Sequence, residues 1–181
     1  MKKILVTGGT TFVSKYAAEY FVNMGYEVYV LNRNTKSQVR GVKLIEGDRH
    51  NLNGILKNLS FDVVADITAY NEKDIIDFVK ELGSYGQYIM ISSSAVYPEY
   101  GVQPFLEESE KAANIFWGTY GTDKIAAEKA LLERVKDAYI LRPPYLYGPM
   151  NNVYREAFVF DCALADRKFY LPKDGDMKLQ F

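Results

Sequence analysis

Short apolar runs alternate with segments of helical periodicity along most of this 181-residue chain. Strands are expected at residues 4–6, 28–31, 42–45, 63–65, 88–91 and 139–141. Helices are expected at residues 12–24, 51–56, 71–82 and 120–135. Continuous apolar runs of this length are typical of strands buried on both faces of a parallel sheet. The alternation therefore predicts an α/β fold with a doubly wound parallel sheet and helices on both faces.

The first helix and the C-terminal segment allow more detailed expectations. Tyr16, Tyr20 and Met24 share a helical face with other apolar residues, so this face is expected to pack on the sheet. Gly25 is placed to end that helix. After residue 148 a further helix is expected at 154–165, with extended pieces at 169–171 and 177–181.

Composition excludes several classes of protein. The net charge of −1 shows no excess of basic residues, which argues against a nucleic-acid partner. A single cysteine, Cys162, forms no internal disulfide and fits a reducing compartment. No segment approaches the roughly 20 apolar residues of a membrane span. A cytoplasmic protein without membrane contact is therefore expected.

A glycine-containing turn lies between the first expected strand and the first expected helix. Backbone N–H groups in such a turn, together with the helix N-terminus, bind a pyrophosphate. Against the G-x-x-G-x-x-G pattern Gly8 matches, whereas Thr11 and Ser14 replace the later glycines. The position predicts NAD or NADP binding and a Rossmann-type fold, and the alternative is a tight turn without a ligand. The residues expected to hold the cofactor here are Thr7, Gly8, Gly9, Thr10, Thr11, Phe12 and Val13.

The ends of the second and third strands bear on the choice of cofactor. Asn32 and Arg33 stand where an acidic residue would accept the ribose 2′-OH of NAD. An arginine there pairs with the 2′-phosphate of NADP instead, so NADP is favoured over NAD. The alternative is a solvated loop arginine. Asp48 is expected to hydrogen-bond the adenine amino group, and its alternative role is a turn cap. The neighbouring Arg49 is also expected to contact the cofactor.

Hydroxyl and amine groups follow in the second half of the chain. Ser92, Ser93 and Ser94 come directly after the fifth strand, at the edge where ligands of open α/β sheets bind. Tyr120 and Lys124 are four residues apart, so they share a helical face. Because an ammonium beside a phenol favours the phenolate, such a pair supplies a general acid or base.

The order and spacing of these motifs, with 141–149 (Leu-Arg-Pro-Pro-Tyr-Leu-Tyr-Gly-Pro), resemble the extended short-chain dehydrogenase/reductases, the NAD-dependent epimerase/dehydratase family. The resemblance implies that Tyr120 is the catalytic acid/base and that Lys124 holds the nicotinamide ribose. It implies that Ser93 hydrogen-bonds the reacting oxygen, with Ser94 as the second candidate. No metal is expected.

Further site residues follow from the same resemblance. The cofactor is expected to contact Ser92, the 68–70 backbone and the segment after the sixth strand, namely Thr68, Ala69, Tyr70, Pro143 and Tyr145. Trp117 and Tyr145 are expected to wall the substrate pocket, with core packing as the alternative for Trp117. Tyr145 replaces an asparagine that many nucleotide-sugar enzymes carry, which is a departure from the pattern.

The resemblance also predicts organisation and activity. Residues 1–149 are expected to form the dinucleotide-binding domain with the catalytic residues, and 150–181 the start of a substrate region that is C-terminally truncated. The expected activity is hydride transfer on a sugar or sugar-nucleotide, in a protein that pairs as a homodimer. The alternative is an NADP-binding regulatory or RNA-associated protein of the same fold without turnover, since the variant group that this turn resembles includes RNA-binding plant proteins.

Overall fold

A six-stranded parallel sheet forms the centre of the computed structural model, which describes residues 1–171 and 175–176. Its strands are β1 (Lys3–Thr7), β2 (Glu27–Asn32), β3 (Lys43–Glu46), β4 (Ser60–Asp66), β5 (Ser84–Ile91) and β6 (Tyr139–Leu141). The helices are α1 (Phe12–Asn23), α2 (Glu72–Val79), α3 (Thr119–Arg134) and α4 (Glu156–Leu164), with a 3-10 turn η1 (Ser94–Val96).

The strand order is β3-β2-β1-β4-β5-β6, and every neighbouring pair is parallel. This is the Rossmann order, in which the chain reverses direction across the sheet between β1 and β4. Ligands of such sheets bind outside the carboxyl ends of the strands, at that reversal point. The predicted fold class is confirmed.

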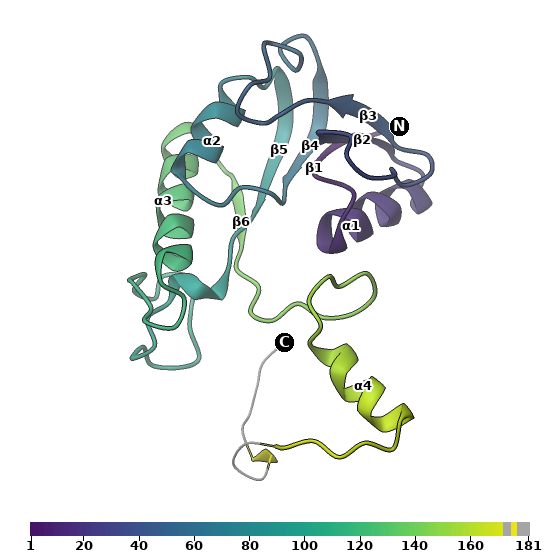
Figure 1. Cartoon of the computed structure of the whole chain (residues 1–181). Coiled ribbons are helices and arrows are strands. Elements are labelled where there is room, and N and C mark those ends of the chain that lie inside the picture. Colours follow the sequence, from purple (N-terminus) through teal and green to yellow (C-terminus); the bar gives the residue numbers. More distant parts are fainter. Residues whose placement is uncertain (172–174, 177–181) are drawn as a thin grey trace.

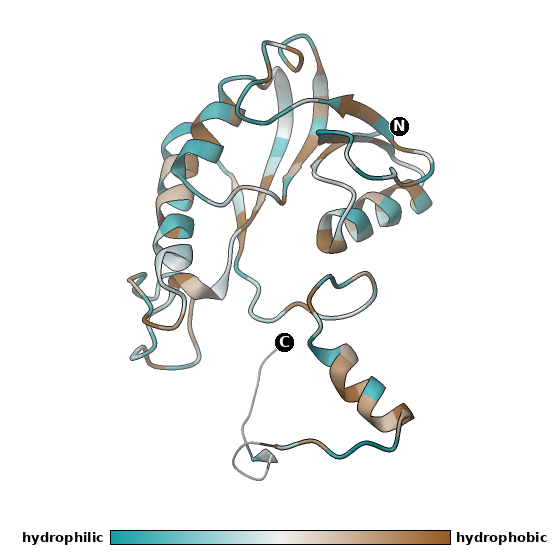
Figure 2. Cartoon of the chain, viewed as in Figure 1, coloured by the Kyte–Doolittle hydropathy of each residue, from teal (hydrophilic) through white to brown (hydrophobic). Residues whose placement is uncertain are grey.

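Side chains of the central strands pack alternately against the two faces. In β1, Leu5 belongs to the core beneath α2 and α3, whereas Ile4 and Val6 belong to the core beneath α1. Figure 1 shows α2 and α3 on one side of the sheet and α1 on the other. Figure 2 shows that the strands are mostly apolar, as expected for strands covered on both faces. The helix α4 stands apart from the sheet.

The face of α1 that meets the sheet matches the expected one only in part, since Phe21, an apolar residue of the expected face, packs against the core. Ser14 and Ala18 are its buried residues, whereas Tyr16, Tyr20 and Met24 are 54%, 50% and 56% exposed. Two small side chains one turn apart let the helix axis lie close to the strands, and the large side chains are left at its margin. Gly25 ends the helix with φ +80°, as expected.

The helix expected at 51–56 is absent, and this stretch is a series of turns closed by bonds such as Ile55 N–H to Leu52 O. Asn53 and Gly54 have φ of 51° and 79°, and two successive left-handed residues interrupt a right-handed helix. No strand includes 169–171, and 177–181 lies outside the described residues. In the described part of the chain, every helix is too short or too polar to cross a membrane.

Candidate functional site

Two adjoining cavities follow the carboxyl ends of the strands, with volumes of about 410 Å³ and 440 Å³. The first extends from the glycine turn to the ends of β2 and β3, and the second from the start of α1 to Ser93, Tyr120 and Lys124. Thr11, Thr68 and Tyr70 line both cavities. The structure therefore brings the predicted cofactor turn and the predicted catalytic residues to one continuous cleft.

The glycine turn has backbone geometry that side chains do not tolerate. Gly8 and Gly9 have φ of +90° and +87°. A Cβ on Gly9 would lie 2.5 Å from Val30 Cγ1, and one on Gly8 would lie 2.8 Å from Ser14 Oγ. Ser14, which replaces the third glycine of the pattern, donates its hydroxyl to Thr11 O at 2.9 Å. The turn thus keeps a close approach to the sheet despite the imperfect motif.

The N-terminus of α1 opens onto this cleft without a side-chain cap. Thr11 is the N-cap residue, yet its hydroxyl accepts no backbone bond from the helix, and the first turn contains no acidic residue. The first N–H groups of a helix lack intrahelical partners and carry partial positive charge. Thr11, Phe12 and Val13 line the second cavity. These features fit the pyrophosphate of a dinucleotide.

The end of β2 holds the glycine turn and presents positive charge to the first cavity. Asn32 donates its amide to Gly8 O at 2.7 Å, so it positions the turn from behind. Arg33 is exposed and lines the first cavity. Lys36 lines it too and donates to Thr11 Oγ1 at 2.9 Å. Sequence reasoning missed Lys36 because the Thr11 contact spans 25 residues, and its only sequence signal was a second basic residue in the loop after β2.

Asp48 and Arg49 line the first cavity but are engaged differently. Asp48 is exposed and accepts the His50 N–H at 2.9 Å, which is the turn-capping role given above as its alternative. The Arg49 guanidinium turns inward, donating twice to the Asp66 carboxylate at 3.0 Å and once to Thr68 Oγ1 at 3.0 Å. Arg49 therefore supports the walls of the cavity more than it reaches into it.

Asp66 is the buried centre of this support and was not predicted. Its carboxylate also accepts Thr7 Oγ1 at 2.8 Å and the Tyr88 hydroxyl at 2.6 Å. Burial by itself raises the pKa of this carboxyl, but the Arg49 guanidinium and the hydrogen bonds outweigh that effect and hold the pKa below its ordinary value. The network ties the ends of β1 and β4 to the segment after β3.

Tyr120 and Lys124 lie one turn apart near the start of α3, as expected. Tyr120 is 38% exposed, and Lys124 is buried. Lys124 Nζ donates to Ala69 O at 2.6 Å and to Ile91 O at 2.9 Å. Burial lowers the pKa of Lys124 to about 8. The ammonium lies 5.0 Å from the centre of the Tyr70 ring and 5.9 Å from that of Tyr120.

The three serines take different orientations. Ser93 lines the second cavity, and its hydroxyl accepts the Ala95 N–H at 3.2 Å. Ser92 also lines this cavity, but its hydroxyl donates to the buried Glu128 carboxylate at 2.6 Å. Ser94 belongs to η1 and is absent from the lining of the cavities described here. Of the three serines, Ser93 best fits the expected role, which is a hydrogen bond to the reacting oxygen.

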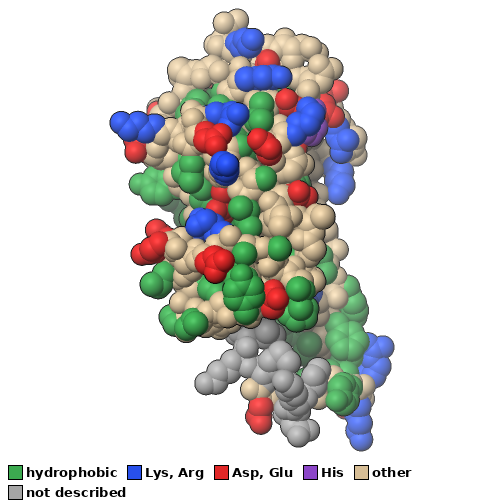
Figure 3. All heavy atoms as spheres, turned by 90° about the vertical axis from the view of Figure 1, so that its left-hand side faces the viewer, with side chains coloured by type: hydrophobic (Ala, Val, Ile, Leu, Met, Phe, Trp, Pro, Cys, Tyr) green, Lys and Arg blue, Asp and Glu red, His purple; other side chains and the backbone are tan. Residues whose placement is uncertain are grey.

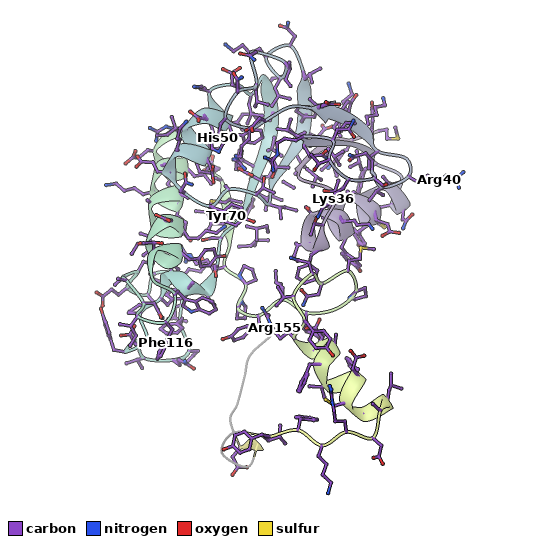
Figure 4. All side chains as sticks on the ribbon, viewed as in Figure 1. Lys36, Arg40, His50, Tyr70, Phe116 and Arg155 are labelled. Atoms are coloured by element: carbon purple, nitrogen blue, oxygen red, sulfur yellow. The ribbon has the colours of Figure 1, made fainter. Side chains whose placement is uncertain are left out.

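The Trp117 ring lies between the rings of Tyr120 and Tyr145 in a chain of aromatic contacts. The Trp117 ring centre lies 6.3 Å from that of Tyr120 and 6.4 Å from that of Tyr145. Trp117 is 43% exposed, so it is not part of the core, and neither Trp117 nor Tyr145 lines either of the two cavities. Pro143 lines the second cavity directly. Figure 4 shows Lys36 on the α1 side of the cleft and Tyr70 on the α2 side, with Arg155 below them at the start of α4.

The fold and the cleft are those of a Rossmann-type α/β protein, and comparison with known sequences gives the family. A family model described as "NAD dependent epimerase/dehydratase family" matches residues 4–181. The chain belongs to this family.

Two curated relatives match most of the chain. The "Chloroplast stem-loop binding protein of 41 kDa b, chloroplastic" of Arabidopsis thaliana is 27% identical over 96% of this chain and 50% of its own length. The "Probable GDP-L-fucose synthase 1" of Oryza sativa subsp. japonica is 26% identical over 85% of this chain and 53% of its own length. The chain spans about half the length of these relatives.

Solved structures share the fold. A UDP-glucose 4-epimerase superposes with a TM-score of 0.73 at 19% identity, covering 93% of this chain and 62% of that one. The Bordetella bronchiseptica enzyme WbmG, in complex with NAD, superposes with a TM-score of 0.76 at 18% identity, covering 93% and 61%. These likenesses show the fold alone.

Proposed function

We propose that this chain forms the cofactor-binding and catalytic half of an NAD(P)-dependent oxidoreductase of the epimerase/dehydratase type. The observation that carries the proposal is the single cleft that joins the glycine turn to Ser93, Tyr120 and Lys124. A turn that only connects a strand to a helix has no need of these three side chains at the far end of the same cleft.

Each catalytic side chain has a role that its contacts support. A bound nicotinamide would accept or supply a hydride, and Tyr120 would move the proton of the reacting hydroxyl. With a pKa of about 8, Lys124 is mostly charged at neutral pH, and its ammonium lies 5.9 Å from the centre of the Tyr120 ring. Two of its three donors bind carbonyls, which leaves one for a ribose hydroxyl. Ser93 accepts from Ala95 N–H, so its own proton is available for the reacting oxygen.

The proposal extends to the class of cofactor and the class of substrate. Arg33 in the first cavity, with no acidic residue at the end of β2, favours NADP over NAD. Trp117 and Tyr145 beside Tyr120 offer broad apolar ring faces to a substrate. Relatives named for UDP-glucose and GDP-L-fucose support a sugar or sugar-nucleotide.

Turnover by Tyr120→Phe in the full-length protein tests this assignment. Losing a general acid/base costs about 10²- to 10⁴-fold in turnover, while NADPH affinity should be unchanged. Tyr139→Phe is the matched control, because this exposed tyrosine lies on β6 outside both cavities. Undiminished turnover in Tyr120→Phe would refute the assignment.

A second candidate is a binding protein of the same fold without turnover, associated with RNA. The stem-loop binding relative, matched over 96% of this chain, favours it. Against it stand the net charge of −1 and the mixture of acidic and basic side chains over the α2 and α3 face in Figure 3. Salt-sensitive binding of an RNA stem-loop, with no turnover across a broad panel of sugars, would favour this candidate over the enzyme.

A further inference from the structure

We propose that Lys36 is a ligand for the pyrophosphate of the cofactor and that Thr11, where the motif has glycine, holds it in place. The proposal rests on the proposed dinucleotide site and deepens it. Lys36 Nζ donates to Thr11 Oγ1 at 2.9 Å, and Thr11 is the N-cap residue of α1. A glycine at position 11 would offer no side-chain acceptor, so the departure from the motif and the position of the lysine have one explanation.

The loop that carries Lys36 is anchored to the glycine turn. Gln38 donates to Lys36 O at 2.9 Å and to Asn32 Oδ1 at 3.2 Å. Asn32 in turn donates to Gly8 O at 2.7 Å. These amides bind the backbone of the loop to the same turn that the lysine side chain reaches. A prearranged cation loses less conformational freedom when it binds an anion.

The electrostatic setting of Lys36 favours a bound anion. In the described part of the chain, no carboxylate lies within ion-pair distance of its ammonium. The ammonium instead sits beside the N-terminus of α1, where the helix carries partial positive charge and has no acidic residue in its first turn. Two positive groups held together are unfavourable unless an anion binds between them.

The position of Thr11 distinguishes the pyrophosphate from the 2′-phosphate. Thr11 lines both cavities, and so marks their junction, whereas Arg33 and Lys36 line only the first. Lys36 nevertheless reaches this junction, because its Nζ donates to Thr11 Oγ1 at 2.9 Å. The pyrophosphate is the part of a dinucleotide that joins its two nucleosides. We therefore assign Lys36 to a group that NADH and NADPH share, and leave the 2′-phosphate to Arg33.

Fluorescence titration of NADH and NADPH against the purified chain tests the assignment. A charge-assisted hydrogen bond to phosphate is worth about tenfold or more in affinity, so Lys36→Met should weaken both cofactors by that factor. Arg40→Met removes the same charge from a side chain that points outward in Figure 4 and lines neither cavity. This control should leave both affinities unchanged.

Thr11→Val removes the hydroxyl and keeps the shape of the side chain. It should weaken both cofactors, and Thr11→Val with Lys36→Met should bind no more weakly than Lys36→Met. If the wild type binds neither cofactor, the proposed function fails. If the wild type binds and Lys36→Met binds equally well, the Lys36 assignment fails. A loss confined to NADPH overturns the pyrophosphate assignment and moves Lys36 to the 2′-phosphate.

Discussion

Gly9→Ala should destabilise the fold far more than the same change at Gly25. Both glycines have positive φ, +87° and +80°, so both alanines carry the backbone cost of about 1–2 kcal/mol. A Cβ at Gly25 has no heavy atom within 4 Å, whereas one at Gly9 lies 2.5 Å from Val30 Cγ1. Carbon atoms pack at about 3.5–4.0 Å, so the turn or Val30 has to move. Overpacking of this kind adds about 1–3 kcal/mol.

The assay is equilibrium unfolding in urea, followed by circular dichroism. We expect losses of about 2–5 kcal/mol for Gly9→Ala and about 1–2 kcal/mol for Gly25→Ala. Val30→Ala in the Gly9→Ala background removes Val30 Cγ1 but keeps Val30 Cβ, 2.9 Å from the new Cβ, so the double-mutant cycle should show a favourable coupling that recovers part of the loss. This background also serves if Gly9→Ala by itself fails to fold. Equal losses for the two glycines, with no coupling to Val30, would refute the argument from close packing.

Two further predictions concern buried charges. Asp66→Asn removes the nearer of two buried carboxylates that face the Arg49 guanidinium, at 3.0 Å against 4.0 Å for Asp74, and should cost about 3–5 kcal/mol of unfolding free energy. Because the folded pKa of Asp66 is lowered, its contribution to stability is present above the unfolded pKa of about 3.9 and is lost as pH falls through the folded pKa. Urea midpoints measured against pH should therefore show a loss of stability in acid that is smaller in Asp66→Asn. An identical pH dependence in both proteins would contradict this prediction. Lys124 should titrate near pH 8 in side-chain NMR spectra, and that signal should be missing in Lys124→Met. Titration near the ordinary pKa of 10.5 would show that burial does not lower the pKa of Lys124.

Hydrophobic periodicity predicted the strands and the class of fold because a continuous apolar run records local burial on both faces of a sheet. The same reasoning expected Tyr16, Tyr20 and Met24 of α1 to pack on the sheet, and these three side chains are exposed instead. Ser14 and Ala18 face the sheet because their size allows close approach, and a hydrophobicity pattern does not record that. The turns at Asn53 and Gly54 depend on positive φ angles, which a hydrophobicity pattern does not record either.

Motif order picked out Ser93, Tyr120 and Lys124, which line the second cavity together, because each lies where a strand ends or a helix begins. The pairings around them escaped prediction. Arg49 and Asp66 are 17 residues apart, and Lys36 and Thr11 are 25 apart. Such contacts depend on how the strands are ordered, so a sequence scan sees only separate charged and polar residues. Ser92 also makes a contact that the sequence does not reveal, because its hydroxyl donates to the Glu128 carboxylate.

Binding of a nicotinamide dinucleotide to the cleft is the central claim. Titration of the purified chain with NADPH and with NADH, followed by the fluorescence of the reduced nicotinamide, measures it directly. Saturable binding of both is expected, with NADPH the tighter because of Arg33. Tighter binding of NADH would refute the preference for NADP, and no saturable binding of either cofactor would contradict the dinucleotide site itself.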